Sequence, residues 1–297
     1  MFNDISRPPL REAELRSALV DGPLADYSEV RVVEEIGSTN AALLEYASTG
    51  DGDRSALIAE FQSSGRGRSG RSWTAPAGSQ VALSVLIRPG AIHPDLFGWL
   101  PLVTGLAVRD ALAGSAGLEA SLKWPNDVMV GDGVEARKIA GILVEMTTVP
   151  AEGVYSMSLP AIVVGVGLNV SLRTEELPVP HATSIDLERA VQGLDPADRL
   201  IVAKELLRAL AVRHDQWRAC ERGSGSVISD ELYYEYIDAC STVGQDVRVE
   251  LPGGETKTGT ATRVDRSGQL VVDTAGGDEP FVVAAGDVHH VRRGSGY

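Results

Sequence analysis

Three arginines lie in a glycine-rich stretch, residues 65–73, which reads GRGRSGRSW. Glycine permits backbone geometries that other residues avoid and lets a ligand approach the main chain. Arginine presents a planar set of donors that suits phosphate and carboxylate oxygens. The chain as a whole is acidic, with 27 basic and 41 acidic residues and a net charge of −14. A local concentration of arginine in such a chain predicts an anion-binding loop.

The glycine spacing of this loop also matches parts of two nucleotide-binding motifs. The loop contains GxGxxG, and it differs from a P-loop in having Arg71 where that motif has lysine. Both motifs need a helix directly after the glycines, because the helix N-terminus supplies part of the phosphate binding. Pro76 and Gly78 follow too closely for such a helix. The sequence therefore argues against a Rossmann or P-loop site, while the alternative of a solvated loop does not explain three arginines beside Trp73.

A second cluster, KWPND at residues 123–127, ends a short apolar run. Pro125 keeps Trp124 extended and ends the predicted strand. Asn126 and Asp127 then present an amide and a carboxylate at the strand terminus, a place that can hold an adenine, a ribose or a metal-bound phosphate. A core tryptophan followed by an ordinary Asx turn is an equally good interpretation of these five residues.

Two apolar strands carry residues that need an explanation. Lys138 enters a strand that is otherwise too apolar to be half-solvated, and a buried lysine requires a partner, which a ligand anion would supply. Lys138 could equally lie at the exposed start of the strand with its stem along apolar surface. Gly165 and Gly167 interrupt the strand that leads to Asn169, and strand glycines mark either the close approach of a ligand or backbone, or a bulge.

The elements that must position these residues follow from periodicity and capping signals. Ser38, Thr39 and Asn40 are capping residues before an apolar helical segment, and their use as a ligand platform is the weaker inference. The long apolar segment 94–113 predicts a helix packed on a sheet. Further helices are predicted over 11–20, 197–220 and 230–239, and strands over 31–36, 55–60, 81–87, 122–124, 128–130, 139–146 and 161–166.

The composition changes near Ser241. From residue 242 onward, short β-prone runs alternate with glycine-containing turns, a pattern typical of a small β-barrel. We therefore predict two domains, residues 1–240 and 241–297. His289 and His290, near the end, are interpreted as surface residues.

Composition also limits the classes of partner. The negative charge argues against broad attraction to nucleic acid or an anionic membrane. The two cysteines, Cys220 and Cys240, lack CxxC spacing, which argues against a disulfide framework or zinc knuckle and favours a reducing cytoplasm. The five histidines form no metal-ligand cluster, and we expect neither a targeting sequence nor a segment long and apolar enough to cross a bilayer.

Five segments, taken together in their order and spacing, resemble bacterial biotin protein ligases; they are EIGSTN, AEFQSSGRGRSGRSW, LKWPNDV, RKIAGILVE and VGVGLNV. The resemblance implies an α+β fold, in which a mixed-sheet catalytic domain flanked by helices precedes an SH3-like barrel. It implies that biotin and ATP give biotinyl-5′-AMP and pyrophosphate, and that the biotinyl group then passes to a lysine of a carboxylase's biotin carrier domain. The segment before Glu34 is too short for the DNA-binding domain of family members that are also repressors, so a repressor role is not expected.

The resemblance also implies roles for individual residues. Lys138 and Arg68 would be catalytic, and Asp127 would support Mg²⁺ without a direct protein cluster of metal ligands. The biotin-binding positions would be Ser38, Thr39, Asn40, Gln62, Gly65, Arg66, Gly67, Arg68 and Lys138. The nucleotide-binding positions would be Arg68, Arg71, Trp73, Trp124, Asn126, Asp127 and Asn169.

Three further expectations complete the prediction. We expect a cytoplasmic protein that is a monomer or weak homodimer and binds no nucleic acid or membrane. No enzyme nucleophile is expected, because the acceptor lysine supplies it. The alternatives are an acyl-adenylating enzyme similar to lipoate protein ligase and, from another class, a non-catalytic biotin sensor.

Overall fold

The computed structural model describes residues 4–22, 25–48, 52–150, 158–220, 227–251, 253–274, 279–284 and 286–291. Its larger part contains a seven-stranded sheet with the order β1-β2-β3-β7-β6-β5-β4. The strands are β1 (Glu29–Ile36), β2 (Ser55–Gln62), β3 (Gln80–Ile87), β4 (Ser121–Lys123), β5 (Asp127–Val130), β6 (Arg137–Pro150) and β7 (Ser158–Asn169). β1 and β2 run parallel, and every other neighbouring pair is antiparallel. The predicted mixed sheet is confirmed.

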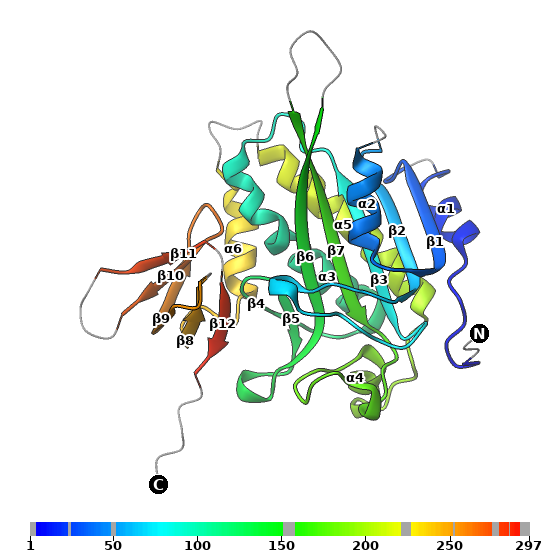
Figure 1. The fold of residues 1–297 in the computed structure, drawn as a ribbon. Helices are drawn as coiled ribbons and strands as arrows, with labels where there is room; N and C mark the ends of the chain where they lie inside the picture. The colour runs from blue at the N-terminus through cyan, green and yellow to red at the C-terminus, as the bar shows by residue number, and fades with distance from the viewer. Residues whose placement is uncertain are drawn as a thin grey trace.

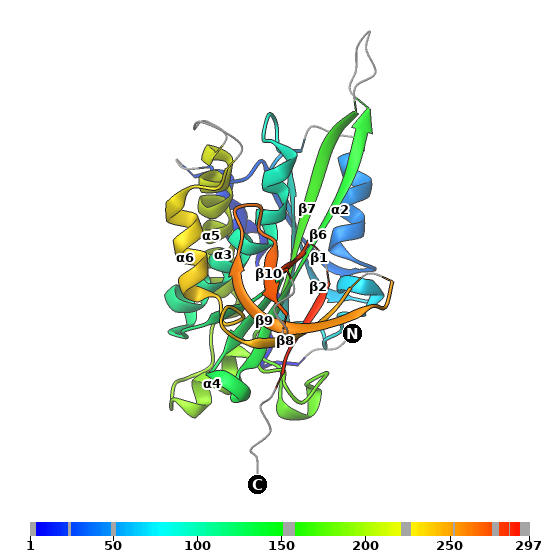
Figure 2. The same ribbon diagram turned by 90° about the vertical axis from the view of Figure 1, so that its left-hand side faces the viewer.

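Helices cover both faces of this sheet (Figures 1 and 2). They are α1 (Glu12–Leu19), α2 (Thr39–Ala47), α3 (Leu100–Ala116), α4 (Ile185–Val191), α5 (Arg199–Ala219) and α6 (Asp230–Ala239). α3, α5 and α6 lie on one face, and α2 lies on the other. α1 packs against β1 and α5, and α4 lies near the end of β7. The helix predicted over 230–239 has those bounds, whereas α4 was not predicted.

The central strand β3 shows why this sheet reads as continuous apolar runs. Val81, Leu83 and Val85 pack into the large core shared with α3 and α5, whereas Leu86 packs into a smaller core with Leu43 of α2. Successive side chains of a strand point to opposite faces, so a strand covered on both sides needs apolar residues on both. Gln80 and Ser84 are the polar residues of this buried strand.

The apolar segment Pro94–Ala116 corrects one expectation. Its length and composition are sufficient for crossing a membrane, although we predicted that no segment would pass this test. However, 67% of its most apolar window is buried inside the protein. The segment comprises a 3-10 helix, Pro94–Trp99, followed by α3, which packs on α5 and the sheet. These contacts are those of a core helix.

A separate five-stranded antiparallel sheet follows α6, with the order β11-β10-β9-β8-β12. The strands are β8 (Asp246–Glu250), β9 (Thr256–Val264), β10 (Leu270–Asp273), β11 (Phe281–Val283) and β12 (Asp287–His290). The predicted small β-rich unit is confirmed. The interpretation of His289 and His290 as mere surface residues was incomplete, because both lie in β12 and His290 is half-buried against Thr242, 3.1 Å from its hydroxyl.

Two tryptophans of the larger part donate hydrogen bonds to the C-terminal part of the chain. Trp99 Nε1 donates to Arg266 O at 2.8 Å, and Trp124 Nε1 donates to Gly268 O at 3.0 Å. Tyr233 of α6 donates its hydroxyl to Val264 O at 2.9 Å. These contacts place the small sheet beside the end of β4 that leads into KWPND. The domain boundary at residues 240 and 241 stays a prediction.

Candidate active site

A cavity of about 230 Å³ opens on the α2 side of the large sheet. The N-terminus of α2, the arginine-rich loop, the strands β6 and β7 and the segment 178–182 line it. The structure thus brings together segments that lie far apart in the chain. The predicted residues that line the cavity are Ser38, Thr39, Asn40, Gln62, Arg66, Gly67, Arg68, Arg71, Trp73, Asn126, Lys138 and Asn169.

One end of the cavity is built on the first turn of α2. The Ser38 side chain caps the helix by accepting from Ala41 N, as its sequence predicted. Thr39 donates both its backbone N–H, at 2.8 Å, and its hydroxyl, at 3.0 Å, to Gln62 Oε1. Thr39 and Gln62 are 3% and 8% exposed, so these polar groups are held in place before any ligand arrives.

Asn40 is fixed at the same end by strands of the sheet. Its Nδ2 donates to Leu143 O at 3.2 Å and to Glu145 Oε2 at 2.9 Å. A Cβ on Gly165 would lie 2.1 Å from Asn40 Oδ1. Gly165 is therefore glycine because the Asn40 side chain occupies the space above it, which explains one of the two strand glycines.

The arginine-rich loop has a folded backbone. Trp73 N donates to Gly65 O at 2.9 Å, and Gly67 N donates to Arg71 O at 2.6 Å. A Cβ on Gly65 would lie 2.2 Å from Trp73 O, so only glycine permits this closure. Only a short 3-10 turn, Arg68–Gly70, follows the first glycines, as expected for a loop that is not a P-loop. Gly65 supports the loop and does not line the cavity.

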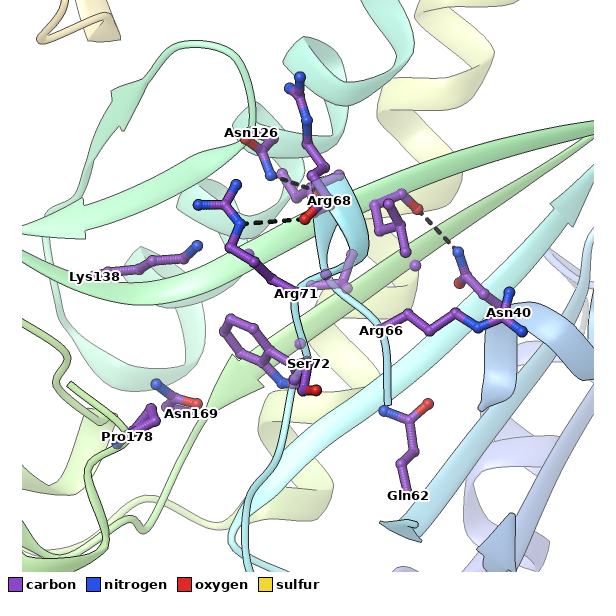
Figure 3. A pocket seen from close by; sticks show the side chains of 18 of the residues that line it. Asn40, Gln62, Arg66, Arg68, Arg71, Ser72, Asn126, Lys138, Asn169 and Pro178 are labelled. Carbon is purple, nitrogen blue, oxygen red and sulfur yellow. Dashed lines mark hydrogen bonds between the residues drawn. The ribbon is translucent and has the colours of Figure 1, made fainter. Parts of the chain in front are cut away.

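Figure 3 shows the side chains of the three loop arginines, which contact different parts of the fold. Arg66 Nη1 lies 3.6 Å from Glu145 Oε1 of β6. Arg71 Nη2 lies 2.7 Å from Asp287 Oδ1 of β12, and Arg68 Nη2 donates to Gly286 O at 3.2 Å. Burial lowers the pKa of Arg68, against the opposing effect of Asp287.

Trp73 explains the second strand glycine. Cβ atoms on Gly167 and Gly141 would lie 2.4 and 2.9 Å from its ring. Its Nε1 donates to Gln80 Oε1 at 2.6 Å. The aromatic ring thus packs on glycines of β6 and β7 and lines the cavity.

Lys138 lies at the start of β6, with its side chain 23% exposed. Its Nζ is 2.5 Å from Asp127 Oδ1 and 5.4 Å from the centre of the Trp73 ring. Both sequence interpretations therefore contribute, since the lysine is near a strand start and also has an anionic partner. Lys123 is a further cation near Asp127. Burial lowers the pKa of Lys123, and Asp127 opposes that shift.

The polar residues assigned to the nucleotide divide into two groups. Asn126 and Asn169 line the cavity, and their Nδ2 atoms donate to Ile142 O at 2.8 Å and to Thr183 O at 2.9 Å. Asp127 does not line the cavity, although it contacts Lys138, which does. Trp124 is 2% exposed and lies outside the cavity, where its indole contacts the C-terminal sheet.

The sequence reading missed the segment that closes the cavity near Lys138. Pro178, Val179, His181 and Ala182 line the cavity wall there. Lys138 N donates to His181 O at 2.7 Å, which holds this segment beside β6. Figure 3 shows Lys138, Asn169 and Pro178 on one side of the loop and Asn40 and Arg66 on the other. The segment carries no recognisable motif, so only the strand-like pairing with Lys138 reveals it.

The described part of the chain contains no group of three or more histidine, cysteine, aspartate or glutamate side chains that could hold a metal. A single carboxylate, Asp127, lies beside the cavity lysine. Mg²⁺ usually binds through one or two carboxylates together with substrate phosphates. The site therefore fits a metal that arrives with a nucleotide and does not fit an all-protein metal centre.

Family models match both parts of the chain. The biotin/lipoate A/B protein ligase family matches residues 32–169, and the biotin protein ligase C terminal domain matches residues 242–291. These spans contain nearly all of the large sheet, most of the residues that line its cavity, and the small antiparallel sheet.

Individual relatives and a solved structure agree with these matches. The biotin–acetyl-CoA-carboxylase ligase of Mycobacterium tuberculosis is 42% identical over 97% of this chain and 98% of its own length. The bifunctional ligase/repressor BirA of Escherichia coli is 31% identical over 86% of this chain and 73% of its own. The structure of the Aquifex aeolicus biotin protein ligase in complex with biotin and ATP superposes with a TM-score of 0.68 and 25% identity, covering 89% of this chain and all of that one. The chain therefore belongs to the biotin/lipoate A/B protein ligase family, and within it to the biotin protein ligases.

Proposed function

We propose that this protein is an ATP-dependent biotin protein ligase. It activates biotin with ATP to biotinyl-5′-AMP and transfers the biotinyl group to a lysine of a biotin carrier domain. The observation that carries the proposal is a single cavity with two chemically different ends. Buried hydrogen-bonding groups of α2 and β2 form one end, with Arg66 beside them at Glu145, and the cations Arg68, Arg71 and Lys138 line the other.

The neutral end suits the ring system of biotin. Thr39, Asn40 and Gln62 supply buried amide and hydroxyl groups, which bind an uncharged polar ring without requiring ionisation. Ser38 begins the helix that carries Thr39 and Asn40, Gly65 permits the folded loop, and Gly67 lines the cavity. These residues are the proposed biotin site.

The cationic end suits the carboxylate of biotin and the phosphates of ATP. Each loop arginine and Lys138 already contacts a carboxylate or a carbonyl oxygen of the protein, so ligand oxygens would replace those partners. Trp73, Asn126 and Asn169 lie along the same wall and would contact the nucleotide. We assign Trp124 and Asp127 indirect roles, because they lie behind this wall.

The first chemical step joins two anions. A carboxylate oxygen of biotin attacks the α-phosphorus of ATP, and the bond from that phosphorus to the bridging oxygen breaks to release pyrophosphate. Positioned cations stabilise the charge on the phosphoryl oxygens, which is the main requirement of phosphoryl-group chemistry. Asp127 would support, from behind the wall, a Mg²⁺ ion held mainly by the phosphates, and the metal would supply further charge neutralisation.

In the second step the amine of the carrier lysine attacks the acyl carbon of the adenylate. The bond to the phosphate oxygen breaks, AMP leaves, and the amine loses its proton. The arginine-rich loop would exclude water from the mixed anhydride until the carrier arrives. We also propose that residues 1–240 form the catalytic domain and 241–297 the C-terminal domain, and that the protein acts in the cytoplasm as a monomer or weak homodimer.

The test is mass spectrometry of a carboxylase's biotin carrier domain after incubation with the protein, ATP and biotin. We expect one added biotinyl group on one lysine, and none when ATP is omitted. Transfer from lipoate instead of biotin would establish the lipoate-ligase alternative. Binding of biotin with neither biotinyl-5′-AMP formation nor transfer would establish the non-catalytic sensor.

A further inference from the structure

Ser84 lies in the middle of β3, behind the neutral end of the cavity. Its side chain is fully buried, and it does not line the cavity. Its Oγ is 2.7 Å from Thr39 Oγ1 and 2.6 Å from Asn40 Oδ1. Its partner across the sheet is Gly165, whose missing side chain makes room for Asn40. A strand hydroxyl thus contacts two proposed biotin-site residues at once.

The hydrogen atoms available here determine the direction of these bonds. Asn40 Oδ1 can only accept, so the Ser84 hydroxyl donates to it. The same hydroxyl also donates to Thr39 Oγ1 at 2.7 Å. The Thr39 hydroxyl in turn donates to Gln62 Oε1 at 3.0 Å, an oxygen that also receives the Thr39 backbone N–H at 2.8 Å. Ser84 therefore holds the side-chain oxygens of Thr39 and Asn40 together, with the Thr39 proton directed to Gln62.

The consequence is a defined pattern of acceptor and donor at the cavity surface. With its proton committed to Gln62 and one lone pair accepting from Ser84, Thr39 Oγ1 presents its remaining lone pair to a ligand. Gln62 lines the same end, and in the described part of the chain its Nε2 donates to no other residue. An acceptor beside a donor is complementary to an N–H next to a C=O, the arrangement found in a cyclic urea.

We propose that Ser84 is a positioning residue that makes this site select the ureido ring of biotin; the proposal rests on the biotin ligase function proposed above. A lipoyl dithiolane has no N–H and would leave the Thr39 acceptor unpaired. Sites built to hydrogen-bond a substrate group reject analogues that lack it far more strongly than apolar pockets reject a size change. Ser84 acts through Thr39 and Asn40 without touching the ligand.

The experiment measures biotin binding by calorimetry and KM for biotin and ATP separately. In Ser84→Ala we expect the Kd and KM for biotin to rise about tenfold, the effect of one lost hydrogen bond, with KM for ATP within about twofold of wild type. If Ser84→Ala does not fold, Ser84→Cys keeps the volume with a weak donor and should show the same separation. Equal rises in both KM values, or no change in biotin affinity, would overturn the proposal.

Two controls separate this role from simple destabilisation. Ser55→Ala removes another buried strand hydroxyl, one that contacts Ser28 at 3.3 Å, and it should leave both KM values unchanged. Biotin analogues in which oxygen replaces either ureido N–H should bind wild type about tenfold more weakly in one isomer, and this ratio should fall toward one in Ser84→Ala. A ratio that stays the same would refute the role of Ser84. Failure of the wild-type protein to bind biotin at all would instead refute the proposed function.

Discussion

The two ends of the cavity are built from opposite kinds of contact. At the neutral end, Thr39, Asn40 and Gln62 are 3%, 4% and 8% exposed and bond mainly to one another and to the sheet. At the cationic end, the Arg71 side chain is 58% exposed, and its partner is a carboxylate of β12. Arg66, beside the neutral end, is likewise 54% exposed and pairs with Glu145 of β6. The first end has the geometry of a formed binding site. At the second end, the cations are paired with protein groups that ligand oxygens could replace.

This difference reflects the two ligands. A neutral ring gains little from water-exposed charges, so its site must be dry and its polar atoms fixed in advance. Triphosphate and carboxylate anions attract cations from a distance, and exposed ion pairs of little net stability are easily exchanged for ligand oxygens. We therefore expect substitutions at the neutral end to alter affinity and stability together, and substitutions at the cationic end to alter the chemistry while leaving the fold intact.

The largest effect should follow loss of the lysine between Asp127 and Trp73. We expect Lys138→Ala to slow biotinyl-5′-AMP formation by roughly a hundredfold or more, because one preorganised charge that stabilises the transition state is lost. Pyrophosphate release under single-turnover conditions measures it. Lys257→Ala is the matched control, since Lys257 also lies over an aromatic ring, 5.3 Å from the centre of Phe281, but on the C-terminal sheet. Near-normal adenylation by Lys138→Ala would remove Lys138 from the mechanism.

Adding one methyl group to each strand glycine tests the contrast between fixed and movable contacts. In Gly165→Ala the new Cβ would meet Asn40, which is held by several bonds, so we expect a loss of about 1–3 kcal/mol in unfolding free energy and more than tenfold weaker biotin binding. In Gly167→Ala it would meet Trp73, a partly buried side chain of a loop that can shift, so the stability loss should be smaller.

Chemical denaturation and calorimetry of the two glycine variants give the comparison. Gly114→Ala serves as the control, because no atom lies within 4 Å of its new Cβ and alanine favours the helix there. Equal destabilisation by the two strand substitutions would show that the neutral end is no more rigid than the loop.

A smaller effect is expected from the loop itself. Arg68→Gly removes a cation whose side chain donates to Gly286 O. Because a single hydrogen bond is lost, thermal stability should hardly change. Release of preformed biotinyl-5′-AMP should become about five to ten times faster, because a charge-assisted bond to the intermediate is lost. A trapping assay with a large excess of unlabelled biotin measures release. Arg31→Gly, at an exposed position of the edge strand β1, is the control and should release the intermediate as wild type does. An unchanged release rate in Arg68→Gly would argue against retention by the loop.

The smallest effect should be on the pH dependence of the unfolding free energy. It concerns the place where His290 of β12 and Trp124 both contact Thr242. Thr242 Oγ1 accepts from Trp124 N at 3.0 Å and lies 3.1 Å from His290 Nε2. Burial, with a contribution from Lys123, lowers the pKa of His290 from 6.5 to about 4. Because the unfolded chain binds the proton more readily, stability is full above about pH 6.5 and falls as the pH drops toward 4.

His290→Gln should therefore reduce the loss of unfolding free energy between pH 7 and 5 by on the order of 1 kcal/mol, allowing for partial exposure. Urea denaturation at the two pH values measures it, with His93→Gln at an exposed position as the control. If the two variants lose stability equally on acidification, His290 is not a source of acid sensitivity.

Much of the fold could be predicted because its signals are local. The helix over 230–239 was predicted at its observed bounds, since capping Ser229 and the apolar spacing lie within a few residues. β6 and β7 extend beyond their predicted ranges and pair antiparallel along their length. The pairing keeps both strands extended where their apolar pattern weakens. α4 is short, and β12 contains two histidines, so neither gave a strong periodic signal.

The candidate site was predicted from its motifs, but its internal contacts were not. The sequence placed Trp124 with the nucleotide residues, whereas its indole contacts Gly268 outside the cavity. No pattern in the sequence linked Arg71 to Asp287, 216 residues away, or Ser84 to Thr39, 45 residues away. Strand periodicity determines which face a side chain occupies, but it does not determine which residue lies opposite it.

The sequence by itself thus determined the kinds of chemistry present, because a glycine-rich arginine loop, a capped helix start and an apolar strand with one lysine are written in neighbouring residues. Only the tertiary structure decided that these groups share one cavity, that Asp127 holds Lys138, and that Ser84 orients Thr39. The physical reason is that hydrogen-bond direction and ion pairing depend on distances of about 3 Å between atoms that the chain brings together only when the sheets and helices pack.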